Sequence, residues 1–118
     1  MAESTGVILI KGERQRQIAN EGFTAEHDAQ HKNGELCKAA IAYARVAFAQ
    51  VFLGPDYGHN KRREKGAFRY FNWPWDEESW KPTDDAVCNL KKAGALIAAE
   101  IDRITRENWP DGEGGVHG

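Results

Sequence analysis

The chain has few of the features that constrain small folds covalently or place them in a membrane. Its 118 residues contain only two cysteines, Cys37 and Cys88, whereas small secreted domains carry dense disulfide frameworks. We therefore expect reduced thiols in a helical core. No apolar run approaches the ~20 residues of a membrane span. The run from Gly6 to Ile10 is too short for a signal-peptide core. A cytoplasmic location without a membrane partner is expected.

An excess of charge of one sign is also absent. Lysine and arginine number 16 against 18 acidic residues, for a net charge of -2, so no overall field attracts nucleic acid or an anionic membrane. The sequence has no glycine-rich phosphate loop, no Ser-His-Asp order and no Cys-x-x-Cys pair, so no motif names a catalytic residue or a cofactor. The length suits one helical domain over residues 1–110, with a flexible tail over 111–118.

Helical patterns dominate what is present. The first predicted helix runs from about Thr5 to Asn20 with Ser4 or Thr5 as its cap, although its apolar start also permits a strand. The second follows Asn33-Gly34 and ends at Gly54-Pro55. A short further helix is possible between Thr24 and His31. We predict an all-α fold, a compact bundle of three main helices with a long aromatic-rich loop.

The third long helix has the clearest pattern. It should begin at Thr83 or Asp84 and end at Trp109-Pro110. An apolar stripe follows three-four spacing through Val87, Leu90, Gly94, Ile97, Ile101 and Ile104. This stripe predicts the buried face, so Ile97→Ala should cost about 2–5 kcal/mol.

Residues 54–82 lack a helical period and contain most of the aromatic side chains. The segment 69–73 suggests a short strand. Trp73 and Trp75 are either part of the core or the wall of a ligand pocket. Lys61, Arg62, Arg63, Lys65 and Arg69 alternate with aromatic residues, a mixture that can bind single-stranded nucleic acid. The acidic run 76–78 permits local ion pairing instead.

Several short sequence motifs in fixed order resemble those of one known group of proteins. They are Glu13-Arg-Gln-Arg-Gln, Glu21-Gly-Phe-Thr-Ala-Glu-His-Asp, His31, Gly34-Glu-Leu, Ala39-Ala40, Tyr43, Trp73-Pro-Trp-Asp, Trp80-Lys-Pro and Leu90-Lys-Lys-Ala-Gly-Ala-Leu-Ile-Ala-Ala-Glu-Ile-Asp-Arg. Together they resemble a widespread, uncharacterised family of small proteins from tailed phages and prophages. The resemblance implies a phage-encoded protein acting inside an infected bacterium and transfers no catalytic residue. The chain departs from the pattern at Phe23, where the family has Trp, and in the basic segment 59–65.

Two groups of polar residues are candidate ligand-binding sites. Glu13, Arg14, Arg16 and Gln17 lie on a helix half too polar for a core, and the two long outer helices could bring Glu100 beside them. Such an edge could hold a phosphate through arginine and ribose hydroxyls through glutamate. The same charges could instead form inter-helix ion pairs.

The second group is His27, Asp28, His31 and Glu35. Spacing of four residues would place both histidines and Glu35 on one helix face, as in a zinc site. Asn33-Gly34 interrupts such a helix, so a capping and hydrogen-bonding cluster without metal is the favoured interpretation.

The function predicted from these features is a non-enzymatic phage accessory protein, with an anti-defence role as its most concrete form. Its expected partner is a host factor or a small phosphorylated, nucleotide-type signal, and a homo-oligomer is compatible with the sequence. One alternative is a metal-dependent nucleotide pyrophosphohydrolase of the MazG type. A magnesium site of that type needs paired acids on neighbouring helical turns. Here the residue three positions after Glu13, Glu35 and Glu100 is a base in each case, namely Arg16, Lys38 and Arg103. The other alternative is a nucleic-acid-binding module.

Overall fold

Helices make up all the regular secondary structure of the residues that the structure describes, which are 2–54 and 66–108 of a computed structural model. In chain order the elements are α1 (Thr5–Asn20), α2 (Ala25–Ala29), α3 (Glu35–Phe52), α5 (Ala67–Tyr70), a 3-10 turn (Glu77–Ser79) and α6 (Ala86–Asn108). The predicted all-α fold with three main helices and an aromatic-rich loop is confirmed.

The first two helices begin at side-chain caps. The Ser4 hydroxyl accepts a hydrogen bond from the backbone N–H of Val7 at the start of α1. The Thr24 hydroxyl does the same for His27 at the start of α2. These caps satisfy N–H groups that have no partner inside the helix. The apolar start of α1 is therefore helical, and the alternative strand there is wrong.

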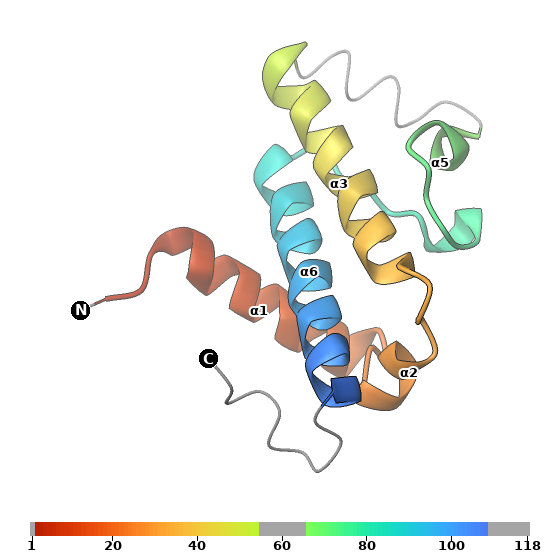
Figure 1. The fold of residues 1–118 in the computed structure, drawn as a ribbon. Coiled ribbons are helices and arrows are strands. Elements are labelled where there is room, and N and C mark those ends of the chain that lie inside the picture. The colour runs from red at the N-terminus through yellow and green to blue at the C-terminus, as the bar shows by residue number, and fades with distance from the viewer. Residues whose placement is uncertain (1, 55–65, 109–118) are drawn as a thin grey trace.

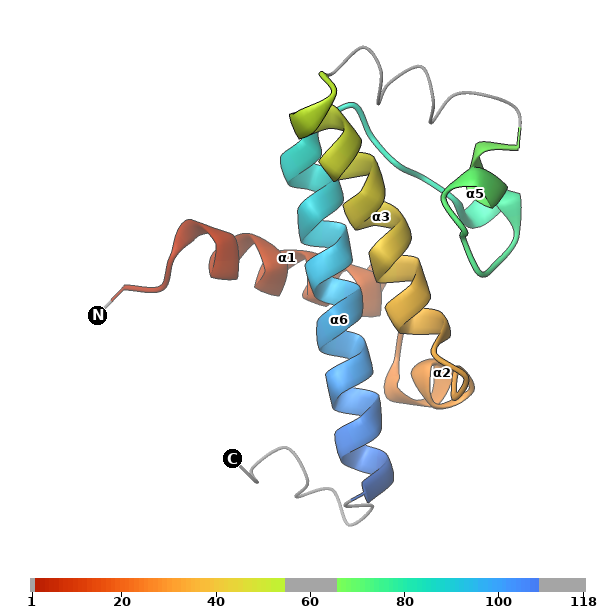
Figure 2. The same ribbon diagram turned by 45° about the horizontal axis from the view of Figure 1, so that its top comes forward.

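Helices α3 and α6 lie side by side and antiparallel, and α1 crosses α6 on the other side (Figures 1 and 2). Small residues make the close approach of α3 and α6 possible. Ala39 and Ala42 of α3, and Ala95 and Ala99 of α6, have at most 1% of their surface exposed. The N-terminal half of α1 projects away from the other helices (Figure 1).

The buried face of α6 is not the apolar stripe that the sequence predicts. Leu90, Ile97 and Ile101 are 48%, 50% and 59% exposed, whereas Leu96 is 1% exposed. Because one residue turns a helix by about 100°, the alanine-rich face with Leu96 meets α3 and the larger side chains point elsewhere. The prediction that Leu90, Ile97 and Ile101 are buried together is wrong.

The segment 66–85 lies against α3 as an irregular, partly helical layer. Its helix α5 includes Arg69 and Tyr70, so the predicted strand over 69–73 is wrong. Trp73 is 8% exposed, and its ring packs against Tyr43 of α3 at 5.3 Å.

The start of α6 also differs from the prediction. Asp85, not Thr83 or Asp84, caps it, because its carboxylate accepts from the N–H of Val87. The predicted helix end at Trp109-Pro110 and the predicted tail 111–118 lie outside the described residues.

The cysteines do not share a core. Cys37 is exposed and Cys88 is half-buried, and both thiols are free. The prediction that they are buried is wrong because both lie off the faces through which α3 and α6 meet.

Candidate functional site

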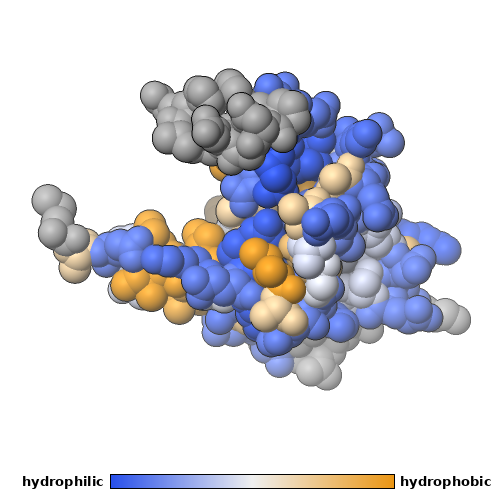
Figure 3. Space-filling view, turned by 90° about the horizontal axis from the view of Figure 1, so that it is seen from below, coloured by the Kyte–Doolittle hydropathy of each residue, from blue (hydrophilic) through white to orange (hydrophobic). Residues whose placement is uncertain are grey.

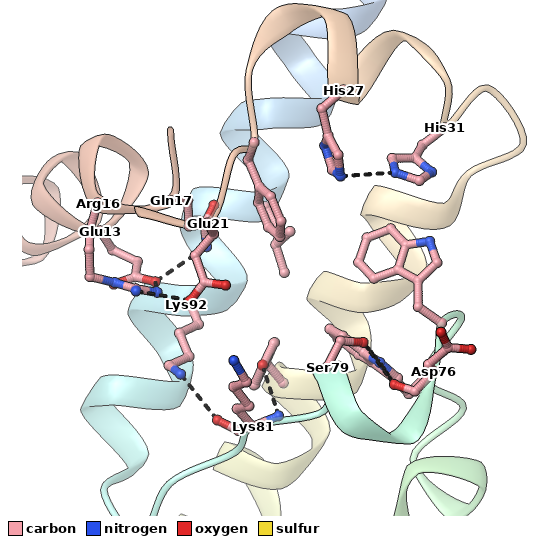
Figure 4. A pocket seen from close by; sticks show the side chains of 15 residues that line it. Glu13, Arg16, Gln17, Glu21, His27, His31, Asp76, Ser79, Lys81 and Lys92 are labelled. Carbon is pink, nitrogen blue, oxygen red and sulfur yellow. Dashed lines mark hydrogen bonds and ion pairs between the residues drawn. The ribbon is translucent and has the colours of Figure 1, made fainter. Parts of the chain in front are cut away.

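A cavity of about 420 Å³ opens where α1, α2, α3, α6 and the segment 73–81 converge (Figure 4). Side chains from segments far apart in the sequence form its wall. They are Glu13, Arg16, Gln17, Glu21, Phe23, His27, His31, Tyr43, Trp73, Trp75, Asp76, Ser79, Lys81, Lys92 and Leu96. This volume lies within the ~300–1,000 Å³ typical of small-molecule sites.

The polar half of α1 forms one wall of the cavity. The Glu13 carboxylate is 4% exposed and accepts two hydrogen bonds from the Arg16 guanidinium, at 2.9 and 2.7 Å. Gln17 Nε2 donates a third at 3.3 Å. Arg16 also donates to Glu21, at 3.0 Å. One guanidinium therefore pairs with both carboxylates of this wall, and the three groups together keep one negative charge.

These contacts determine the protonation state of the wall. Burial acts to raise the pKa of Glu13, but the hydrogen bonds and charge of Arg16, with the charge of Lys92 and the bond from Gln17, outweigh it and lower the pKa. The hydrogen bond to Glu13 is the main cause of the raised pKa of Arg16. The pair is therefore ionised at neutral pH.

The Gln17 side chain borders this cavity, and one of its polar atoms has no partner in the described part of the chain. It is 3% exposed, and its amide oxygen has no hydrogen-bond partner among the described residues. A buried acceptor without a partner costs free energy.

Aromatic rings form a second wall. The rings of Phe23 and His27 are stacked, with centroids 4.8 Å apart and planes at 5°. His27 meets His31 edge to face at 4.8 Å, and His31 lies 4.9 Å from Trp75. These half-buried rings present flat, polarisable surfaces to the cavity.

Two ammonium groups lie at the opposite end of the cavity from the histidines (Figure 4). Lys92 Nζ donates to the Lys81 carbonyl oxygen at 3.1 Å and lies 5.5 Å from the centroid of the Tyr43 ring. Within the described part of the chain, neither lysine forms an ion pair at 4 Å or less. Positive charge at this end is therefore not neutralised by a direct contact.

Tyr43 connects this end of the cavity to the core. Its hydroxyl accepts a hydrogen bond from the Lys81 backbone N–H at 3.3 Å. Burial raises the pKa of Tyr43 to about 12. The phenol therefore stays neutral and holds the chain at Lys81 against α3.

Seven of the residues predicted to bind a ligand line this one cavity. They are Glu13, Arg16, Gln17, His27, His31, Trp73 and Trp75. Arg14 and Asp28 lie behind the wall, where Arg14 donates to the fully buried Asp28 carboxylate at 3.1 Å. This contact ties α1 to α2.

Glu35 and Glu100 do not line the cavity. The Glu35 carboxylate accepts from the Asn33 N–H at 2.7 Å; its own backbone N–H is the main cause of its lowered pKa. Glu100 accepts from Arg103 at 2.6 Å, which fixes it on α6. The predicted approach of Glu100 to Arg16 is wrong, because Glu100 has a nearer base on its own helix.

The histidine cluster is held by hydrogen bonds. His27 Nδ1 lies 3.0 Å from Asp28, and the Nε2 atoms of His27 and His31 lie 3.5 Å apart. Among the described residues, no group of three or more histidine, cysteine or acidic side chains is arranged to hold a metal ion. The contacts of His27 with Asp28 and of Glu35 with the Asn33 N–H are hydrogen bonds within this cluster.

The basic segment of the nucleic-acid alternative is largely beyond the described residues, since Lys61, Arg62, Arg63 and Lys65 fall in 55–65. Arg69 is described, and its guanidinium lies 5.2 Å from the centroid of the Phe68 ring. Arg69 does not line the cavity.

Tyr43, Lys81 and Lys92 are cavity residues that the sequence does not single out, because no local pattern marks any of them as part of a site. All three fall within motifs quoted above for the resemblance to small phage proteins, namely Tyr43, Trp80-Lys-Pro and Leu90-Lys-Lys.

Comparison of the chain with protein-family models, curated proteins and solved structures finds no match. No helix in residues 2–54 and 66–108 is long and apolar enough to cross a bilayer.

Proposed function

We propose that this chain binds a small phosphorylated, nucleotide-type ligand in the cavity and leaves it chemically unchanged. One observation carries the proposal: the aromatic rings at His27, His31 and Trp75 lie at one end, and the ammonium groups of Lys81 and Lys92 at the other. A nucleotide has the matching pair of features, a planar base and an anionic phosphate.

Each end of the cavity suits its part of such a ligand. Lysine ammonium groups donate charge-assisted hydrogen bonds to phosphate oxygens. Stacking of a base on an aromatic side chain is worth about 1–3 kcal/mol.

The wall at Glu13 favours binding over metal-dependent hydrolysis. A magnesium ion needs several oxygen ligands that are free to face it. Both Glu13 oxygens accept hydrogen bonds from Arg16, and Glu21 accepts from the same guanidinium. The carboxylate oxygens are therefore engaged by Arg16 and are not free to coordinate a cation.

The resemblance to small phage proteins supplies the biological setting of the proposal. A protein of this kind would act inside an infected bacterium. Binding without turnover would sequester a nucleotide signal, an activity suited to countering host defence.

Thermal shift and calorimetry with AMP, ADP-ribose and cyclic di-AMP test the proposal directly. A ligand that binds only the folded chain raises its melting temperature, by an amount set by ligand concentration over Kd. We expect at least one probe to do so, and chromatography after incubation with magnesium to recover that probe intact. Conversion of the probe would favour the pyrophosphohydrolase alternative.

Replacing the two lysines locates the site. In Lys81→Gln/Lys92→Gln, we expect Kd for the probe to rise at least about tenfold, equivalent to about 1.4 kcal/mol. The matched control is Lys32→Gln/Lys38→Gln, which makes the same change in net charge at exposed positions away from the cavity. Unchanged affinity in the first variant, or binding of none of the probes by the wild type, would contradict the proposal.

A further inference from the structure

An apolar surface covers parts of α1 and α6 on the side that does not meet α3. Its members are half-exposed aliphatic side chains, each between 42% and 59% exposed: Val7, Ile8, Ile18, Val87, Leu90, Ile97, Ile101 and Ile104. Figure 3 shows the apolar side chains gathered on the projecting arm of α1. We refer to these eight residues as the α1/α6 face.

The two helices are joined within this face by a close contact. Gly94 lies in the middle of the α6 stripe, and a Cβ atom there would stand 2.6 Å from Ile10 Cδ1. Ile10 therefore sits directly on the α6 backbone. To one side of this crossing, an apolar groove of about 330 Å³ is lined by Leu9, Val87 and Leu90.

The size of the face is large for a monomer. Half the surface of an aliphatic residue is on the order of 80–90 Å², so eight such residues expose roughly 700 Å². The largest apolar patch of a typical monomer is about 300–600 Å². Each partner in a stable interface of standard size buries about 800 Å². The face therefore has nearly the area that one subunit of a dimer requires.

The face has a step in it. The ribbon of α1 crosses α6 on this side and its N-terminal half projects beyond the other helices (Figures 1 and 2), so α1 lies one helix layer above the α6 stripe at the crossing. A two-fold axis brings the same patch of both subunits together, so one chain's arm can lie against the other chain's stripe.

From the area and the shape we infer that the α1/α6 face binds a second copy of this chain, forming a two-fold symmetric dimer. The arm residues Val7 and Ile8 of one copy pack near Ile97 and Ile101 of the other. This pairing accounts for a helix end that contacts little within its own chain and for large aliphatic side chains left exposed along α6. It does not depend on the ligand proposed for the cavity.

Sedimentation velocity of the full chain over a concentration series up to about 100 µM tests the inference. The wild type should sediment as a dimer. Ile97→Lys and Val7→Lys each place a charge in the interface from a different helix, and each should raise the dimer Kd at least tenfold. Ile41→Lys is the matched control, because Ile41 is equally exposed, at 52%, but lies on α3. It should leave the dimer intact.

A milder variant keeps the test valid if a lysine disturbs folding. Ile97→Ala/Ile101→Ala adds no charge, and its circular dichroism spectrum should match that of the wild type while the dimer weakens at least tenfold. A wild type that stays monomeric throughout the series overturns the inference. So does a dimer that all three interface variants leave unchanged.

Discussion

At the scale of single residues, Glu13 has the most constrained environment in the cavity. It is a nearly buried carboxylate that accepts three hydrogen bonds from Arg16 and Gln17. Its hydrogen-bond partners come from its own helix, and the charge of Lys92 on α6 further favours the ionised carboxylate.

The lowered pKa of Glu13 predicts a specific pH dependence. A carboxyl group whose pKa is lower in the folded state stabilises the fold above its unfolded value, here 4.5, and loses that contribution as pH falls through the folded value. We expect Glu13→Gln to lower the free energy of unfolding by about 1.5–3 kcal/mol at pH 7. The variant should also show a smaller loss of stability than wild type below pH 4.5.

Urea denaturation at a series of pH values measures both effects. The exposed acid Glu26 provides the control, and Glu26→Gln should change stability by less than about 0.5 kcal/mol. If the stability of Glu13→Gln falls with acid as steeply as that of wild type, the ionised Glu13–Arg16 pair is not the cause.

At the scale of elements, α6 contributes side chains to three different surfaces. Its alanine-rich face packs on α3, Lys92 and Leu96 reach the cavity, and the aliphatic stripe meets Ile10 of α1 at Gly94. Because α6 has three contact faces, its most apolar stripe need not be the face that packs in the core. The larger apolar side chains of α6 lie on the face that only the arm of α1 partly covers.

Neighbouring residues of α6 should therefore respond very differently to truncation. Leu96→Ala removes a side chain that is 1% exposed, and we expect a loss of about 2–5 kcal/mol. Ile97→Ala removes one that is 50% exposed, and its cost should be less than half as large. Chemical denaturation at low protein concentration, where self-association is weakest, compares the two. Equal losses of stability in the two variants would indicate that the aliphatic stripe is part of the core.

At the scale of the whole molecule, the aromatic segment supplies the bulk that the alanine-rich helices lack. Trp73 and Trp80 pack on Tyr43 with ring centroids 5.3 and 5.0 Å away, and Trp73 Nε1 donates to Ser79 at 3.0 Å. The same segment then positions Lys81 at the cavity. The packing of this segment on α3 therefore also sets the geometry of the site.

Loss of Trp73 should consequently affect both stability and binding. Trp73→Ala should lower the free energy of unfolding by about 3–5 kcal/mol, because the ring is 92% buried against α3. Trp75, a half-buried cavity residue, provides the comparison: Trp75→Ala should weaken binding of the probe with a smaller loss of stability. Calorimetric melting and titration of both variants separate the two roles. A stable Trp73→Ala variant would show that the loop is not part of the core.

Much of the helical framework could be predicted from the sequence because it depends on neighbours in the chain. Ser4 and Thr24 cap helices through hydrogen bonds to residues three positions later. Gly34 starts α3 with a positive φ of 84°, a conformation that glycine adopts easily. The polar half of α1 was also recognisable as a candidate site, because Glu13, Arg16 and Gln17 are helical neighbours.

The tertiary structure alone decided which faces are buried and which residues share the cavity. Periodicity shows that α6 has an apolar stripe, but only the close fit of alanines on α3 places Leu96 inside and Ile97 outside. Lys81 and Lys92 face His27 and His31 across one cavity because an aromatic segment folds onto α3. Caps and helical spacing depend on residues that are close in the sequence, so they can be predicted from it. Packing depends on contacts between segments far apart in the sequence, so it cannot be predicted from any one segment.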